Sequence, residues 1–105
     1  MTFDLEQLKS IVPKVEIYDT FIDGRYSGPT YWLFSYNKET YAMTVSWMVF
    51  KKIILDNGLI QYKPDWVTRT YKYQSVAFKR LRYAMRTVKE WESLEKLNEM
   101  NHDFH

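Results

Sequence analysis

The fold is decided by the last third of the chain, where residues 66–73 (WVTRTYKY) precede residues 76–100 (VAFKRLRYAMRTVKEWESLEKLNEM). Aromatic and β-branched residues dominate the first segment, which predicts a strand. In the second segment apolar residues recur in steps of three and four, which predicts a single helix roughly 37 Å long with Ser75 as its N-cap. The apolar stripe of this helix consists of Ala77, Leu81, Ala84, Val88, Trp91 and Leu94.

A hairpin is predicted upstream, with residues 31–36 and 40–47 as its strands and Asn37-Lys38-Glu39 as its polar turn. In the second strand Tyr41, Met43, Val45 and Trp47 are expected to share one face, because side chains alternate along a strand.

Residues 48–56 allow two interpretations. They can continue the strand, or they can form a short helix that ends at Asn57-Gly58. The strand is preferred because β-branched residues favour sheets. Asp56-Asn57-Gly58 is then a turn into a strand over residues 59–63, and Pro64-Asp65 is predicted to form a second turn.

The N-terminal part of the chain predicts a short helix followed by a strand. Residues 2–12 have apolar side chains at helical spacing, with Thr2 and Asp4 as possible caps and Pro13 closing the helix. Residues 15–22 alternate as a strand does, and Asp23-Gly24 is expected to be the turn that follows.

These elements predict one α+β domain over residues 1–105, with residues 101–105 as a frayed tail. The expected architecture is a short N-terminal helix, a curved antiparallel meander of about five strands, and a long C-terminal helix packed on the sheet. Curvature or a partner is expected because a flat sheet alone cannot bury so long a helix.

Composition excludes several classes of chemistry. The chain has no Cys, so disulfides, thiolate catalysis and cysteine-ligated zinc are impossible. Residues 1–13 lack the apolar region of a secretory signal, and no uncharged stretch is long enough to span a bilayer. A cytoplasmic location is the resulting expectation. Nine Tyr, six Phe and four Trp supply large rings for the core of a short chain.

Charge is sorted along the chain. Residues 51–89 carry ten basic and two acidic side chains, residues 1–50 carry four and six, and residues 90–105 carry one and five. A total of +2 therefore conceals a strongly basic middle segment, which can attract an anionic partner.

Four cations of the basic segment share one side of the predicted helix, opposite its apolar stripe: Lys79, Arg82, Arg86 and Lys89. Like charges on one face repel each other, and a phosphate backbone would offset that repulsion. The alternative is a solvated helix face with local ion pairs, Arg86 with Glu90 and Lys89 with Glu92.

The basic segment also interleaves rings with cations on its strands. Lys63, Trp66 and Lys72 are the candidate contacts there, because exposed rings on a basic sheet can stack nucleobases. Most rings in so small a protein must nevertheless be core. Trp66 is the candidate ring because strand alternation places it on the same face as Lys72.

The charges of the long helix oppose its dipole. Cations occupy the first half, whereas Glu90, Glu92, Glu95 and Glu99 lie in the second half. Two such helices laid antiparallel would match opposite charges, which suggests a homodimer. Surface charges are worth only tenths of a kcal/mol, so an accidental pattern is the alternative.

Support for catalysis is thin. His102 and His105 flank Asp103 in a tail that lacks the rigid surroundings of a metal site, and Glu16, Asp19 and Asp23 are better read as solvated charges than as Mg²⁺ ligands. Neither a His-based triad in a core nor a phosphate loop can be assembled. We therefore expect no enzyme activity, no metal and no cofactor.

Two functions from different classes remain. The first is a small nucleic-acid-binding protein that uses the basic, aromatic-rich surface of the last strand and the C-terminal helix. The second is a protein–protein interaction module, an inhibitor or adaptor of the kind encoded by viruses or mobile elements, in which Tyr, Trp and Arg anchor the interface. Salt dependence separates them, because nucleic-acid affinity falls steeply with salt.

Overall fold

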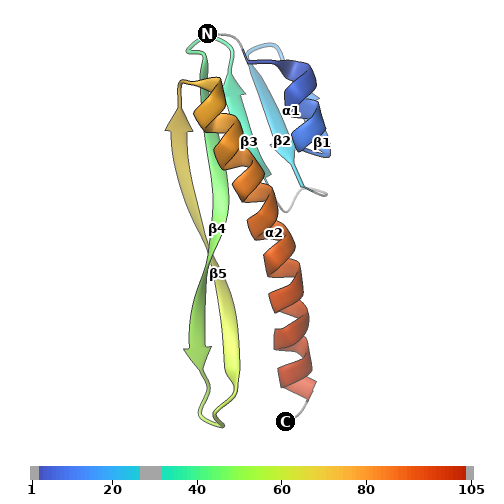
Figure 1. The fold of residues 1–105 in the computed structure, drawn as a ribbon, viewed down its shortest axis with the longest axis vertical. Coiled ribbons are helices and arrows are strands. Elements are labelled where there is room, and N and C mark those ends of the chain that lie inside the picture. The colour runs from blue at the N-terminus through green and yellow to red at the C-terminus, as the bar shows by residue number, and fades with distance from the viewer. Residues whose placement is uncertain (1–2, 27–31, 104–105) are drawn as a thin grey trace.

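A computed structural model describes residues 3–26 and 32–103, and it shows two helices on one antiparallel sheet with strand order β1-β2-β3-β4-β5 (Figure 1). The molecule is elongated, with extents of 52 × 21 × 19 Å. The predicted α+β meander with a short N-terminal and a long C-terminal helix is confirmed. The elements are α1 (Leu5–Ile11), β1 (Lys14–Ile17), β2 (Phe21–Arg25), β3 (Trp32–Asn37), β4 (Ala42–Ile54), β5 (Ile60–Tyr71) and α2 (Gln74–Asp103).

Helix α1 is defined by its caps. The Asp4 side chain accepts hydrogen bonds from the backbone N–H groups of Glu6 and Gln7, as the sequence predicts for a capping aspartate. The helix ends at Ile11, two residues before Pro13. The other predicted cap, Thr2, lies outside the described residues.

The predicted strand over residues 15–22 is wrong, because the chain reverses within it. Strands β1 and β2 pair with each other, and the turn between them lies at Asp19-Thr20, where Tyr18 N–H donates to the Phe21 carbonyl at 2.9 Å. Lys38 N–H donates to the Thr20 carbonyl and so holds this turn against the turn between β3 and β4. Asp23-Gly24, the predicted turn, lies inside β2. The alternation breaks at Asp19-Thr20, where two polar residues follow each other, but no glycine or proline marks the turn.

The β3–β4 hairpin is confirmed with a longer turn than predicted. Asn37 Oδ1 accepts from the N–H groups of Glu39 and Thr40, and Tyr41 adopts a left-handed φ of 57°. Tyr41 therefore belongs to the turn and is exposed, so it does not share the face of Met43, Val45 and Trp47. Those three share one face as predicted, and they are buried. Tyr31, the predicted first residue of the hairpin, lies outside the described residues.

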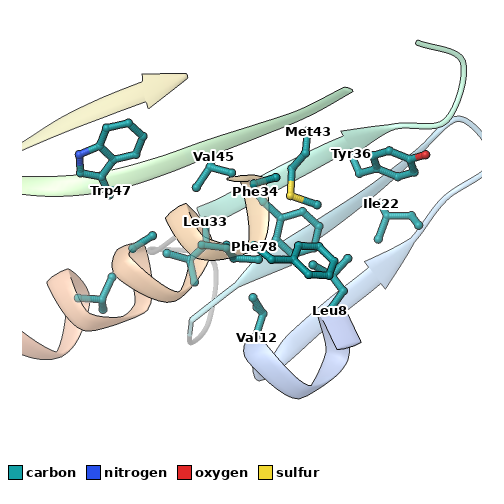
Figure 2. Packing of buried hydrophobic residues seen from close by; sticks show 14 residues of the cluster. Leu8, Val12, Ile22, Leu33, Phe34, Tyr36, Met43, Val45, Trp47 and Phe78 are labelled. Atoms are coloured by element: carbon teal, nitrogen blue, oxygen red, sulfur yellow. The ribbon is translucent and has the colours of Figure 1, made fainter. Parts of the chain in front are cut away.

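Strand β3 contains a bulge at Leu33. Gly24 of β2 pairs with Phe34, whereas Arg25 pairs with Trp32, which leaves Leu33 as an extra residue. Both Leu33 and Phe34 are consequently buried completely in the same cluster, although neighbouring residues of a regular strand face opposite sides (Figure 2).

Strands β4 and β5 form one long hairpin. Residues 48–54 continue β4, so the strand interpretation is confirmed over the helical one. The hairpin closes at the predicted turn, where Gly58 has a φ of +83° and Leu55 N–H donates to the Leu59 carbonyl.

The predicted turn at Pro64-Asp65 is wrong, because β5 runs unbroken through it with Pro64 opposite Phe50. Tyr62 directs its N–H and carbonyl away from β4, and Pro64 follows two residues later with the same orientation. The missing N–H of proline therefore costs no ladder bond. The count of five strands survives because one predicted strand divides into two and two predicted strands merge.

Beyond Val45, strand β4 pairs with β5 without β3, and the resulting two-stranded ribbon twists along α2. Figure 1 shows β4 beside α2 in the upper half and β5 beside it in the lower half. Two side chains of α2 cover the exposed strand edges. Thr87 Oγ1 accepts from Met48 N–H at 3.1 Å, and the Asn98 amide makes two hydrogen bonds, of 2.9 and 2.7 Å, with the backbone of Tyr62.

The core lies where both helices meet the same face of the sheet (Figure 2). Helix α2 was predicted over residues 76–100; it extends further at both ends, so Ser75 lies in its first turn and does not cap it, and residues 101–103, predicted as frayed, are helical. The stripe residues Ala77, Leu81, Ala84 and Val88 are fully buried. Trp91 and Leu94 are only half-buried.

We expect Thr87→Val to destabilise the fold by about 1–3 kcal/mol, because the substitution leaves the buried N–H of Met48 without an acceptor. Thr87→Ser is the matched control: it keeps the hydroxyl, which also donates to the Ala84 carbonyl, and loses one methyl group worth about 0.8 kcal/mol. Urea denaturation measures both. A valine variant as stable as the serine variant would contradict a role for the hydrogen bond.

Candidate nucleic-acid interface

Helix α2 positions the four predicted cations on its outer side. Lys79, Arg82, Arg86 and Lys89 are all exposed, on the side opposite the buried stripe, and they span about 15 Å along the helix axis. We name this surface the α2 basic face.

The predicted local ion pairs are not formed. Within residues 3–26 and 32–100, the structure records no ion pair for any cation of the α2 basic face, including Arg86 with Glu90 and Lys89 with Glu92. Glu92 instead accepts a hydrogen bond from Tyr26, whose pKa is raised first by burial and then by this carboxylate. Among these residues no carboxylate is therefore in ion-pair contact with the basic face.

Two hollows lie along the α2 basic face. The first, which we call the upper hollow, has a volume of about 480 Å³. Its wall combines cations with one ring and two small side chains: Ser75, Val76, Lys79, Arg80, Tyr83 and Arg86.

The second, the lower hollow, has a volume of about 350 Å³ and lies where α1 meets α2. Arg82, Arg86 and Lys89 supply its cations, and Ser10, Ile11 and Met85 complete its wall. Arg86 lines both hollows, so the four predicted helix cations form one continuous surface.

The upper hollow contains two residues that sequence reasoning missed. The guanidinium of Arg80 lies 4.5 Å from the ring centre of Trp47 on β4 and 5.4 Å from that of Tyr83. The guanidinium of Arg86 lies 5.7 Å from the Tyr83 ring on the following turn. Tyr83 is 37% exposed among these cations. In the sequence, Tyr83 lies four residues after Lys79 and three before Arg86, a spacing that places these side chains near one another on a helix. This spacing was the signal by which Tyr83 could have been found.

The other three candidates do not line either hollow. Lys63 and Trp66 lie on β5, Lys72 follows the end of β5 at Tyr71, and all three are exposed. Trp66 belongs to the sheet, where it pairs with Met48 in the register, and Lys63 lies opposite Lys51. The structure therefore brings the four helix candidates together and leaves the other three outside both hollows.

The acidic half of α2 lies beside the lysine-bearing ribbon. The two hydrogen bonds between Asn98 and Tyr62 hold this part of the helix against β5, next to the opposed Lys51 and Lys63. The antiparallel homodimer stays a prediction.

No other constellation of the described residues suggests chemistry. Glu16 and Asp23 face each other across β1 and β2, and Glu16 accepts a hydrogen bond from Tyr18. Among the described side chains no group of three His, Asp or Glu could hold a metal ion, and those of His102 and His105 fall outside the description. In the same residues no helix has the length and apolar character needed to cross a membrane.

Comparison of the chain with protein-family models, curated proteins and solved structures gives no match. The side chains of α2 and their surroundings are therefore the features from which a function can be inferred.

Proposed function

We propose that this protein binds nucleic acid through the phosphate backbone, using the α2 basic face. The observation that carries the proposal is the group of four exposed, unneutralised cations that line two adjoining hollows on one side of α2. Such a group lowers its own repulsion by binding several anions at once, and a phosphate backbone supplies them in a row.

The dimensions of the face agree with such a ligand. The four cations span about 15 Å of helix axis, which is long enough to contact several successive phosphates of one strand. Arg82 and Arg86 can each engage a phosphate through two parallel N–H donors. Among the described residues, the walls of the two hollows contain no Asn, Gln or acidic side chain. Because the proposal assigns the cations of the face to phosphates, little sequence preference is expected.

We expect Arg82→Ala combined with Arg86→Ala to weaken binding about tenfold, because two exposed contacts are worth up to about 1 kcal/mol each. The same change should flatten the slope of log affinity against log salt by about 1.4–1.8, at 0.7–0.9 per lost contact. Neither residue is in the buried stripe, so circular dichroism and thermal unfolding should stay as in the wild type.

Fluorescence anisotropy with single- and double-stranded DNA and RNA, at several salt concentrations, measures both quantities. The matched control is Lys14→Ala with Lys96→Ala, which removes the same charge from exposed positions outside both hollows and should change affinity less. An equal loss in the control would contradict a localised interface. If the wild type binds none of the four nucleic acids at low salt, the proposal is wrong.

The alternative is a protein–protein interaction module, which exposed apolar side chains favour. Tyr73 is 70% and Ile54 72% exposed, at opposite ends of the molecule, and Val76 beside the upper hollow is half exposed. Rings anchor protein interfaces as well as nucleobases. A partner held by such contacts should bind with weak salt dependence, in contrast to a phosphate backbone.

A further inference from the structure

We propose that the upper hollow is a stacking site for one unpaired nucleobase, with the Tyr83 ring as its platform, so that the ligand class is single-stranded nucleic acid. This inference rests on the proposed function and makes it more specific. It assigns the recognition of a base to α2, whereas the phosphate contacts extend from the upper into the lower hollow through Arg86.

The hollow has the composition that a nucleotide requires. Its volume of about 480 Å³ falls within the range of small-molecule sites, which is about 300–1,000 Å³. Among the described residues of its wall, Tyr83 is the only ring, and Lys79, Arg80 and Arg86 surround that ring with positive charge. A base needs a flat apolar surface and its phosphate needs a cation, and both are present within two turns of one helix.

The two arginines beside Tyr83 are held differently. Arg80 lies closer to Trp47, at 4.5 Å, than to Tyr83, at 5.4 Å, so the β4 ring fixes its guanidinium. Arg86 is exposed, lies 5.7 Å from the Tyr83 ring, and has no recorded ion pair among the described residues. Arg86 is therefore the residue that can leave the ring, so that a base occupies its side of Tyr83 while the guanidinium engages the phosphate.

Replacing the Arg86 guanidinium on the Tyr83 ring by a base is favourable, because base stacking is worth more than an exposed cation–ring contact. An exposed contact between a cation and a ring is worth about two- to fivefold, which is what holds Arg86 on the Tyr83 ring. Stacking of a base on a ring is worth about five- to 150-fold in affinity, and the released guanidinium gains a phosphate in addition. A base inside a duplex already has both faces stacked and cannot reach Tyr83 unless it is extruded. Unpaired bases are accordingly the ligands that fit.

The test is Tyr83→Leu, which removes the ring but keeps an apolar residue that favours helices. Affinity for a single-stranded 12-mer of RNA or DNA should fall at least fivefold. Affinity for the corresponding duplex should stay within twofold, and the salt slope should not change. Tyr83→Phe keeps the ring and should bind as the wild type does. A strand of abasic sites should bind Tyr83→Leu and wild type equally, because it has no base to stack.

Trp66→Leu is the matched control, because Trp66 is 38% exposed and Tyr83 37%. The stacking inference predicts that Trp66→Leu leaves single-strand affinity unchanged. It is overturned if Trp66→Leu lowers that affinity and Tyr83→Leu does not, or if Tyr83→Leu affects the single strand and the duplex equally. Failure of the wild type to bind any strand overturns the proposed function itself. Binding that depends on Arg82 and Arg86 but not on Tyr83 overturns the stacking site alone.

Discussion

Gly24→Ala is expected to destabilise the protein by about 3 kcal/mol or more, which lowers its melting temperature by about 12–24 °C. A Cβ at Gly24 would lie 1.8 Å from Cε1 of Phe34 and 2.4 Å from its Cδ1. The Phe34 ring is completely buried and packed from all sides, so it cannot move away without opening the core. A domain of this size has only about 5–15 kcal/mol of stability to lose.

Thermal unfolding by circular dichroism measures this effect, and two further variants establish its cause. Gly58→Ala is the control, because nothing lies within 4 Å of its Cβ position and only the φ of +83° is unfavourable, at about 1 kcal/mol. Phe34→Leu should destabilise the wild type but stabilise the Gly24→Ala variant, because it removes the clash. A Gly24→Ala protein no less stable than Gly58→Ala would show that the close packing of Gly24 against Phe34 is wrong.

Phe78→Ala is expected to cost about 3–5 kcal/mol, clearly more than Trp91→Ala. Phe78 is 1% exposed and lies in the cluster between α1, α2 and the sheet, with the Phe3 ring at 5.7 Å. Trp91 is half-buried and stacks on Phe50 of the ribbon at a ring distance of 6.0 Å. Part of the Trp91 surface already faces solvent, so its truncation leaves a more open cavity than truncation of Phe78, and the cost should be lower, roughly 2–3 kcal/mol.

Urea denaturation of the two variants gives the order directly, since both lie on α2 and differ mainly in burial. From the apolar stripe alone, Trp91 would be the costlier position if its ring were fully buried, because it is the largest residue of that stripe. A greater loss for Trp91→Ala than for Phe78→Ala would contradict the position of the core described above.

The two strand errors show where local patterns become insufficient. Asp19-Thr20 contains no glycine or proline, yet the chain turns there. Two backbone hydrogen bonds hold the turn: Tyr18 N–H donates to the Phe21 carbonyl, and Lys38 N–H donates to the Thr20 carbonyl. Pro64 has the strongest turn chemistry of its segment, yet it continues β5, because its nitrogen points away from β4. In both cases a partner strand decides the outcome, and a local pattern contains no information about that partner.

The candidate site also has one part that local patterns predict and another part that depends on distant segments. A spacing of three and four placed Lys79, Arg82, Arg86 and Lys89 on one side of α2, and that prediction needed nothing beyond helical geometry. The role of Tyr83 and Arg80 could not be predicted with equal ease, because Arg80 is held by Trp47, a residue of β4. Trp66 lies on a strand, as predicted, but that strand position is outside both hollows.

What the sequence determined by itself is local: the cap of α1, the turns at Asn37 and Gly58, the buried stripe of α2 and the cations opposite it. Each depends on residues a few positions apart, whose relative geometry the backbone dictates. Only the tertiary structure decided that Gly24 makes room for Phe34, that the bulge at Leu33 buries two neighbours, and that the twisted ribbon follows α2. These features arise where distant segments meet, because close packing and hydrogen-bond satisfaction are conditions on atoms in space and not on positions along the chain.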